Sequence, residues 1–322
     1  MTNLSPSDDP LAANYTGKHV LITGAGGFIG LHLATHLSRL GAIVEASAKD
    51  KTSVKQGAAN VTVSQLDVSD MAAVEAALQG KHFDVVFHLA AKPAGDRSKE
   101  QMAVQAKVTL GGTINLATAL LNSPDTLLVH IGSSEEYGTG KIPFFENQVL
   151  APISPYGAAK AAASQFLIMA GRSFGLPVII ARPSVVFGPG QSTDMVIPYL
   201  FDCYQKKQPA QISPGEETRD FVYIDDCVEG LLMLGARPDL AGECFNLGSG
   251  VEVKLKRVAF DIARLAGYDG DLGLGSRPYG LVEVMEHKES PAKALDKLGW
   301  QAETSFSDGL LSTYQWWQSQ GK

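Results

Sequence analysis

The chain has 322 residues, which is long enough to bury a large core and to form two lobes. Hydrophobic residues make up 45% of it and charged residues 19%, a balance that excludes collagen-like, repetitive and low-complexity proteins. The net charge of −7 and the pI of about 5.5 argue against a surface that binds nucleic acid or an anionic membrane.

The start of the chain and the cysteines indicate the compartment. Residues 1–16 are polar and lack the basic start and apolar stretch of a signal peptide, and no apolar run reaches membrane-spanning length. Cys203, Cys227 and Cys244 have neither CxxC nor metal-ligand spacing, so we expect reduced thiols and no metal site. These features predict a cytoplasmic protein with no membrane or nucleic-acid partner.

Strands and helices alternate from residue 17 onward. Apolar runs of β-forming residues predict strands at 18–24, 42–48, 61–70, 83–91, 126–132 and 177–183. Amphipathic segments between them predict helices, which include 31–41, 71–80, 102–121 and a long helix from near Tyr156 to about Phe174. This alternation predicts an α/β fold with a Rossmann-type, doubly wound parallel sheet and right-handed crossovers.

The pattern changes after Pro183, where prolines and glycines become frequent and the spacing becomes irregular. We expect 1–16 to be a polar tail, 17–183 plus about 221–249 to be the NAD(P)-binding Rossmann domain, and about 184–220 plus 250–322 to be a smaller interleaved substrate-binding lobe. A ligand-binding cleft is expected between the two, at the carboxyl ends of the strands.

A glycine turn joins the first strand to the first helix. The sequence "TGAGGFIG" spaces Gly24, Gly27 and Gly30 for a tight turn, for close approach of backbone to a pyrophosphate, and for packing of helix on strand. The helix that begins at Phe28 and Ile29 presents unpaired N–H groups to phosphates. In this position the turn predicts dinucleotide binding, although a plain tight turn also needs glycine.

The residues after the second strand bear on the choice between NAD and NADP. An NAD site usually ends this strand with an acid that binds the ribose 2′-hydroxyl, but here the place falls near Ala48, with Lys49 next. This slightly favours NADP, whose 2′-phosphate attracts a cation, unless Asp50 takes the position of the acid; Lys49 as a plain solvated loop lysine remains open. Asp67 is either a partner of the adenine amino group or the cap of the next helix.

Tyr156 and Lys160 lie four residues apart at the start of a helix and therefore share one face. A lysine ammonium beside a phenol favours the phenolate, so we expect a lowered Tyr156 pKa. Such a tyrosine exchanges a proton with a substrate oxygen while a nicotinamide exchanges a hydride. Alone, the YxxxK spacing is equally typical of a surface pair.

The chain resembles the extended short-chain dehydrogenase/reductase family of nucleotide-sugar epimerases, dehydratases and reductases. The resemblance runs from about residue 17 to the end and rests on motifs in the family's order, which are "TGAGGFIG", "LDVSD", "HLAA", "SSEEYG", "SPYGAAK", "ARPSVVFGPGQ", "TRDFVYIDD", "FNLGSG" and "KALDKLGW". It implies that the cofactor contacts Gly24, Gly27, Phe28, Ile29, Gly30, Lys49, Asp67, Val68, Leu89, Ala90, Ala91, Tyr156, Lys160 and Pro183.

The resemblance also assigns the residues in "HIGSSEEYG". Ser133 takes the place of the serine or threonine that hydrogen-bonds the substrate oxygen; the alternative is a serine that caps its own strand end. Ser134 and Glu135 occupy the places of the acid/base pair of the dehydratases, where Glu135 fits the base and Ser134 is not an acid. Glu136 is expected to face solvent.

Within the family the motifs look most like those of GDP-4-keto-6-deoxy-mannose reductases. Two positions depart from the family, because Val185 and Thr109 stand where asparagine is frequent. Arg219 and Arg277 match arginines that clamp the substrate's diphosphate, and their plainer interpretation is a surface ion pair, for Arg219 with Asp220 or Asp225.

The resemblance favours a reductase that uses NAD or NADP on an NDP-linked 4-keto-6-deoxyhexose, with Tyr156 as proton donor and Ser133, Lys160 and Glu135 around it. A 4-epimerase with tightly bound NAD, a 4,6-dehydratase and a non-catalytic nucleotide sensor are the alternatives. Relatives dimerise through the helices that correspond to 101–121 and 156–174, so a homodimer is expected.

Overall fold

The computed structural model describes residues 9–54, 58–92, 98–280 and 282–320. The chain divides into two compact units that interleave along the sequence. The first comprises residues up to Glu136 with 154–182 and 228–245, and the second comprises 137–153, 183–227 and the residues from Asn246 onward.

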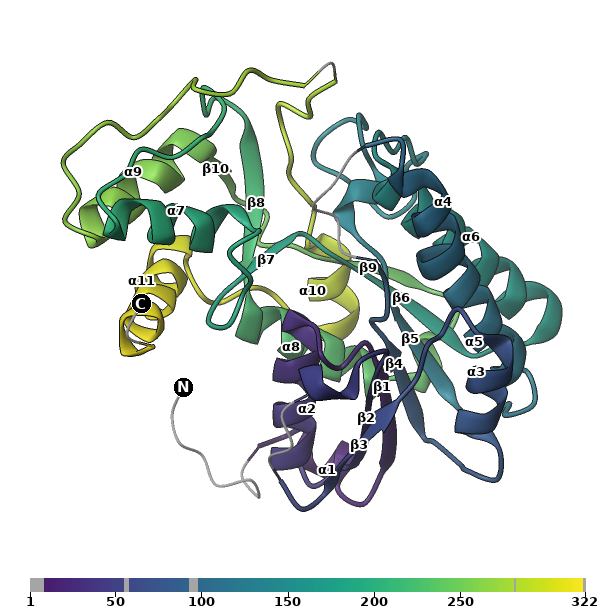
Figure 1. Ribbon diagram of the computed structural model, residues 1–322. Coiled ribbons are helices and arrows are strands. Elements are labelled where there is room, and N and C mark those ends of the chain that lie inside the picture. Colours follow the sequence, from purple (N-terminus) through teal and green to yellow (C-terminus); the bar gives the residue numbers. More distant parts are fainter. Residues whose placement is uncertain (1–8, 55–57, 93–97, 281, 321–322) are drawn as a thin grey trace. The chain divides into compact units, whose positions relative to one another are not determined.

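The first unit is built on a seven-stranded sheet with the order β3-β2-β1-β4-β5-β6-β9 (Figure 1). Its strands are β1 (His19–Thr23), β2 (Ile43–Ala48), β3 (Val61–Gln65), β4 (Val85–His88), β5 (Leu127–Ile131), β6 (Val178–Pro183) and β9 (Cys244–Leu247). Neighbours from β3 through to β6 pair in parallel. The six predicted strands and the Rossmann-type α/β fold are confirmed. Chain order reverses between β1 and β4, and ligands bind at such a switch point.

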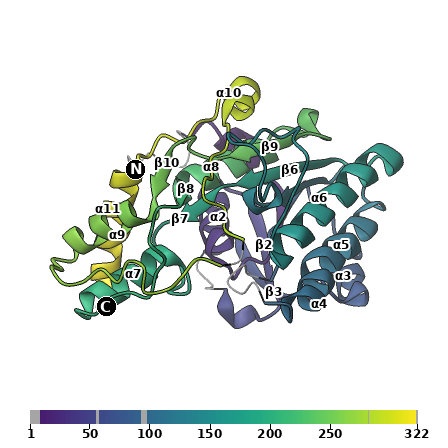
Figure 2. The same cartoon turned by 90° about the horizontal axis from the view of Figure 1, so that it is seen from above.

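Helices cover both faces of this sheet. α2 (Phe28–Arg39) lies on the face opposite α3 (Met71–Leu78), α5 (Gly112–Leu120) and α6 (Pro155–Phe174) (Figure 2). The core beneath α3, α5 and α6 includes Leu21, Val86, Leu128 and Ile180 from the strands and Leu116 and Leu167 from the helices. Their burial removes apolar surface from water and fixes the register of the strands.

The predicted helix 102–121 is interrupted. It begins as α4 (Gln101–Gln105), continues as a π-helical segment (Ala106–Gly111) and ends as α5. A π-helical segment widens a helix and often marks a functional site. A Cβ on Gly112 would lie 2.5 Å from the Cγ2 of Val68, so glycine is required where α5 approaches the loop after β3.

The second unit contains a three-stranded sheet of β10 (Glu252–Lys254), β8 (Thr218–Tyr223) and β7 (Val185–Phe187), in that order. β8 is parallel to β7 and antiparallel to β10. The helices of this unit are α7 (Val196–Gln205), α9 (Leu255–Leu265), α10 (Ala292–Leu298) and α11 (Phe306–Ser319). α8 (Ile224–Gly235) carries the chain back to the first unit.

Several boundaries differ from those expected. Pro183 and residues 137–153, 221–227 and 246–249, placed with the Rossmann domain by sequence, belong to the second unit, so the last residues of β6 and β9 are assigned to that unit. The end of the expected polar tail is structured, because Ala12–Tyr15 form α1 and Tyr15 is buried with its hydroxyl donating to the carbonyl of Leu232 at 2.7 Å. A buried aromatic side chain explains why these residues fold.

The cysteines and the hydropathy of the helices can be compared with expectation. Cys203 and Cys227 are buried, Cys244 is partly exposed, and none forms a disulfide. Among the described residues, no helix combines the length and apolar character that a bilayer crossing requires.

The packing of Tyr15 predicts a measurable contribution to stability. Tyr15→Ala should lower the free energy of unfolding by about 3–5 kcal/mol through the cavity it creates. Tyr15→Phe, which leaves the Leu232 carbonyl without its donor, should cost about 1–2 kcal/mol. Urea denaturation measures both, and Asn14→Ala at an exposed neighbour is the control; equal midpoints for the two alanine variants would contradict the prediction.

Candidate active site

The glycine turn lies between the end of β1 and the start of α2. Gly24 has a φ of 74°, and a Cβ there would lie 2.6 Å from the backbone nitrogen of Ala90. A Cβ on Gly30 would lie 2.6 Å from the carbonyl oxygen of Gly24. The first glycine therefore permits both the turn and its contact with the loop after β4, and the third permits α2 to pack on the turn.

The start of α2 fits a dinucleotide pyrophosphate. Gly27 is the N-cap and has no side chain, so it cannot cap the first N–H groups of the helix. The N–H groups of Phe28 and Ile29 are in this first turn, where helix dipole and donors together favour an anion. The backbone here can hold the diphosphate of NAD or NADP.

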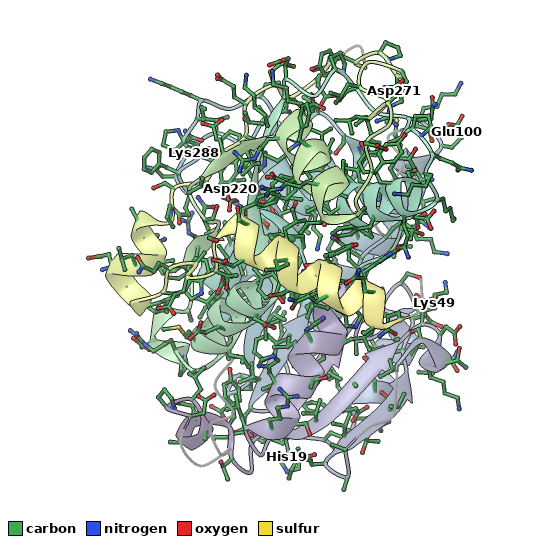
Figure 3. All side chains as sticks on the ribbon, turned by 90° about the vertical axis from the view of Figure 1, so that its left-hand side faces the viewer. His19, Lys49, Glu100, Asp220, Asp271 and Lys288 are labelled. Carbon is green, nitrogen blue, oxygen red and sulfur yellow. The ribbon has the colours of Figure 1, made fainter. Side chains whose placement is uncertain are left out.

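Lys49 and Asp67 form an ion pair next to the end of β2, with 2.8 Å between Nζ and Oδ2. Lys49 lies on the surface of the first unit (Figure 3), with its side chain 74% exposed. Its hydrogen bond to Asp67 is the main cause that lowers the pKa of this carboxyl to about 2. Lys49 is therefore an exposed but paired cation, which differs from a plain solvated lysine.

The other acids near this strand end have local roles. Asp50 accepts hydrogen bonds from the N–H and the hydroxyl of Thr52, at 2.9 and 2.7 Å. The interpretation of Asp67 as the cap of the following helix is wrong, because Asp70 caps α3 by accepting from the first N–H groups. Asp67 is left to Lys49 and to Ser69.

Ser133, Tyr156 and Lys160 come together where β5 ends and α6 begins. Ser154 caps α6 by accepting from the N–H of Gly157 at 3.0 Å, so that Tyr156 lies in the first turn. The Lys160 ammonium lies 5.9 Å from the centre of the Tyr156 ring and donates to the carbonyl of Ile131. The hydroxyl of Ser133 is close enough to lower the pKa of the Tyr156 phenol by hydrogen bonding.

The pKa of the Tyr156 phenol is nevertheless raised. Burial raises the pKa of Tyr156, although part of the residue stays accessible, and the charge of Glu135 acts in the same direction. Burial also lowers the pKa of Lys160 to about 8. The expectation of a lowered Tyr156 pKa is therefore wrong, since desolvation of the phenolate and the charge of Glu135 outweigh the hydrogen bond from Ser133 that lowers this pKa.

The two adjacent glutamates differ in their surroundings. Glu135 is partly exposed and accepts from the Ser154 hydroxyl at 2.6 Å, while its own N–H donates to Oγ of Ser133 at 3.1 Å. Glu136 was expected to face solvent, and this is wrong: it is fully buried and bonded to Arg182. Ser134 is also buried.

His88 of β4 forms hydrogen bonds with Thr23, at the end of β1, and with Thr113 of α5. Thr113 donates its hydroxyl proton to the Thr109 carbonyl, so it accepts from Nε2 of His88, and Nδ1 of His88 then accepts from Thr23. Burial lowers the pKa of His88 to about 3, in keeping with this neutral tautomer. His88 is thus a buried, hydrogen-bonded histidine, and its partner Thr23 directly precedes Gly24.

Thr109 holds the loop after β4 by hydrogen bonds. Its Oγ1 accepts from the N–H of Lys92 at 3.2 Å and donates to Oε1 of Gln105 at 2.7 Å. Gln105 returns to the Lys92 carbonyl with its amide at 3.2 Å. The sequence analysis missed Gln105. Its position four residues before Thr109, on the same face of a predicted helix, could have indicated a hydrogen bond between the two side chains.

Arg219 and Arg277, the two residues predicted to bind the diphosphate, both lie in the second unit and differ in their contacts. Arg219 pairs with Glu283 at 2.8 Å and also donates to the carbonyls of Thr218 and Val284. Arg219 therefore pairs with Glu283, which differs from the predicted partners Asp220 and Asp225. Arg277 is exposed, and its backbone N–H donates to the carbonyl of Ile212.

The sequence matches a family model over residues 20–248, and that model describes the NAD dependent epimerase/dehydratase family. The match covers more than half of the chain. The chain belongs to this family. The predicted membership among the extended short-chain dehydrogenases/reductases is confirmed.

Relatives and solved structures agree with this membership. The chain is 28% identical to a trifunctional UDP-glucose 4,6-dehydratase, UDP-4-keto-6-deoxy-D-glucose 3,5-epimerase and UDP-4-keto-L-rhamnose reductase of Arabidopsis thaliana, over 95% of this chain and 48% of the plant enzyme. It spans only about half the length of the curated plant relatives that it matches.

Two solved structures cover nearly the whole chain. The epimerase Mth375 of Methanothermobacter thermautotrophicus has a TM-score of 0.89 at 28% identity, covering 97% of this chain and 95% of that one. MoeE5, solved with UDP-glucose and NAD, has a TM-score of 0.86 at 28% identity and covers 94% of this chain and all of that one.

The crowding at Gly24 predicts a specific loss of cofactor binding. Gly24→Ala should raise the dissociation constants of NADH and NADPH about tenfold or more, because the new methyl group displaces the Ala90 backbone. Gly17→Ala is the matched control, since Gly17 has the same φ of 74° but open space around its Cβ position. Fluorescence titration measures both variants, and similar constants for the two would refute the role of the turn.

Proposed function

We propose that this protein is an NAD(P)H-dependent reductase of the C4 ketone in a nucleotide-linked 4-keto-6-deoxyhexose, with a GDP sugar as the first substrate to test. The observation that carries the proposal is the cluster of Ser133, Tyr156 and Lys160 at the sheet edge that also bears the glycine turn. The Tyr156 phenol is protonated at neutral pH, as an unshifted tyrosine also is, and this is the state that a proton donor needs.

Tyr156, Ser133 and Lys160 each have a separate role in the proposed reduction. Bound NAD(P)H supplies the hydride to the ketone carbon. The Tyr156 hydroxyl gives its proton to the ketone oxygen as the C–O double bond becomes a single bond, and Ser133 orients that oxygen by hydrogen bonding. Solvent then reprotonates the phenolate. Lys160, held by the Ile131 carbonyl, stabilises the phenolate that forms and can bind the nicotinamide ribose.

Substrate recognition is assigned to Arg277 and Arg219 of the second unit; Ser134, which the sequence also assigned to the substrate, is buried in the first unit. The exposed Arg277 is available to a diphosphate, and its planar fork suits bidentate binding. Arg219 pairs with Glu283, so binding of a diphosphate to its guanidinium requires exchange of one anion for another. Pro183 and Val185 continue the chain from β6 into β7.

We propose NADPH as the preferred reductant. β2 ends at Ala48 with no carboxylate directly after it, and the carboxylate of Asp50 is occupied by Thr52. Lys49 supplies a positive charge at the same place. Parallel titrations with NADPH and NADH measure the preference, and tighter binding of NADH would overturn this part of the proposal.

A 4-epimerase is the second candidate, because Mth375, at 28% identity, is described as an epimerase and MoeE5, also at 28% identity, was solved with UDP-glucose and NAD. An epimerase would be purified with NAD bound and would turn over without added reductant. A 4,6-dehydratase is less well supported, since Ser134 is not an acid and Glu135 is hydrogen-bonded to the helix cap Ser154. Glu135→Gln should cripple a dehydratase and reduce a reductase only slightly.

The assignment of Tyr156 gives a direct test. Wild-type protein should oxidise one NADPH for each 4-keto-6-deoxy sugar consumed, measured by NADPH absorbance and by NMR of the product. Tyr156→Phe should lower kcat by about 10²-fold or more, because the proton donor is lost, while the dissociation constant of NADPH stays within about twofold. Unchanged turnover by the variant would refute the proposal, and turnover without reductant would favour the epimerase.

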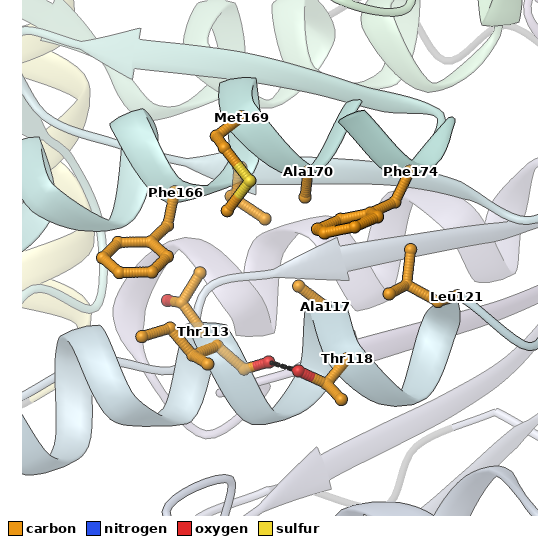
Figure 4. A pocket seen from close by; sticks show the side chains of 10 residues that line it. Thr113, Ala117, Thr118, Leu121, Phe166, Met169, Ala170 and Phe174 are labelled. Atoms are coloured by element: carbon orange, nitrogen blue, oxygen red, sulfur yellow. Dashed lines mark hydrogen bonds between the residues drawn. The ribbon is translucent and has the colours of Figure 1, made fainter. Parts of the chain in front are cut away.

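We also propose that the protein is a homodimer through α5 and α6. Side chains of the two helices line an apolar hollow of about 150 Å³, where Phe166, Met169 and Phe174 of α6 face Ala117 of α5 and Leu121, the C-cap of α5 (Figure 4). Phe174 is 63% exposed and Phe166 is 45% exposed. Contiguous exposed apolar surface of this kind is typical of an interface.

The interface can be tested without touching the catalytic residues. The double variant Phe166→Glu/Phe174→Glu should elute at monomer mass in light scattering, because two buried charges per subunit oppose association. Phe260→Glu, which charges a similarly exposed phenylalanine on α9, is the control and should remain dimeric. A monomeric wild-type protein would contradict the proposal.

A further inference from the structure

Glu136 and Arg182 form an ion pair in the interior of the first unit. The Nε of Arg182 lies 2.8 Å from Oε2 of Glu136, and the two side chains are 2% and 0% exposed. Removing two charges from water costs several kcal/mol per ion, so a pair of this kind is weak evidence of stability by itself. The hydrogen bonds around it indicate what it does.

The carboxylate of Glu136 links three elements. Besides Arg182 of β6, it accepts at Oε1 from the backbone N–H of Ser133, at the end of β5, and from the hydroxyl of Ser164 on α6, each at 3.0 Å. Ser164 is four residues after Lys160 and so lies one turn along the same helix face. Both oxygens of the carboxylate are thereby engaged with residues next to the catalytic cluster.

The residue before Ser133 makes this arrangement possible. A Cβ on Gly132 would lie 2.3 Å from Oε1 of Glu136 and 3.2 Å from Cγ of Arg182. Any side chain at this position would push the carboxylate away from the strand end. Gly132 is therefore required for the contact between Glu136 and the Ser133 backbone.

Glu135 and Glu136 hold α6 at two places. Glu135 accepts from Ser154, the helix cap, and Glu136 accepts from Ser164 in the third turn. Tyr156 and Lys160 lie between these two attachments. Glu135 and Glu136, two adjacent residues that follow β5, thus bond to α6 before and after the stretch that carries Tyr156 and Lys160.

We propose that Glu136 is a positioning residue, which fixes the Ser133 backbone and the Lys160-bearing turn of α6 relative to each other through its contacts with Ser133, Ser164 and Arg182. This inference rests on the proposed function, since it assigns to Glu136 the geometry of that same Ser133/Tyr156/Lys160 site. It adds a residue that contacts neither substrate nor cofactor.

The charge of Glu136 also acts on Lys160. Burial lowers the pKa of Lys160, and Glu136 opposes that shift. The other charged or titratable groups around the cluster are His88 of β4, His130 of β5, Arg182 of β6, and Glu135 and Tyr156. Burial lowers the pKa values of both histidines, so they are neutral at pH 7, which leaves Glu136 as the carboxylate that raises the pKa of Lys160.

The experiment uses three variants of the full chain. Glu136→Gln removes the charge but keeps the shape, and Ser164→Ala removes one hydrogen bond while keeping the Glu136–Arg182 pair. Ser213→Ala is the matched control, because it removes another buried serine–glutamate hydrogen bond, to Glu217 in the second unit. Cofactor affinity, kcat, KM and the pH profile of kcat are measured for each.

Glu136→Gln should lower kcat about tenfold with little change in KM or cofactor affinity, and should move the alkaline limb of the profile to lower pH. The direction follows because Lys160 without the nearby carboxylate loses its proton at lower pH. Ser164→Ala should lower kcat several-fold with an unchanged limb, and Ser213→Ala should match wild type. Wild-type kcat in both site variants overturns the inference; if Glu136→Gln does not fold, Ser164→Ala alone decides.

A second readout separates this inference from the proposed function. NMR titration of Lys160 in the cofactor-free protein should show a lower pKa in Glu136→Gln than in wild type, whether or not any sugar is turned over. An unchanged Lys160 pKa overturns the electrostatic part of the inference. Failure of the wild-type protein to reduce any keto sugar would overturn the proposed function and leave the titration result standing.

Discussion

The spacing between the end of β5 and the first turns of α6 is the constraint on which the site depends. A hydroxyl on the strand and a phenol on the helix act on one oxygen only if the two elements cannot slide past each other. Two neighbouring glutamates bond to opposite ends of the relevant helical stretch, through Ser154 and Ser164. Gly132 provides the room in which the buried carboxylate reaches the strand backbone.

A second set of polar contacts fixes the cofactor side of the sheet. Thr23, His88 and Thr113 form a chain of hydrogen bonds whose directions are determined by the Thr109 carbonyl at its end. Thr109 of the π-helical segment and Gln105 at the end of α4 bond to the loop after β4, which in turn contacts the Gly24 turn. Buried polar groups that are fully bonded rigidify a site, and both sets are of this kind.

The surroundings of Tyr156 affect the protonation of the phenol and of Lys160. A protonated phenol is suited to giving a proton, and a nearby lysine that titrates at about pH 8 supplies charge when the phenolate forms. Reduction of a ketone needs the first property, while oxidation of an alcohol needs the phenolate from the start. Family membership is compatible with both directions, and so is the protonation state of Tyr156, since an unshifted phenol is also protonated at neutral pH.

The sequence by itself determined the order of strands and helices, the glycine turn, the family and the Ser133, Tyr156 and Lys160 positions, because these depend on local periodicity and on motifs at short spacing. Only the tertiary structure decided that Glu136 is buried, that Arg219 binds Glu283, and that residues 137–153 join the second unit. Each of these depends on partners tens of residues away along the chain. Hydrophobic periodicity does not indicate which distant group a charged side chain contacts in the folded protein. Whether that charge is buried depends on this contact.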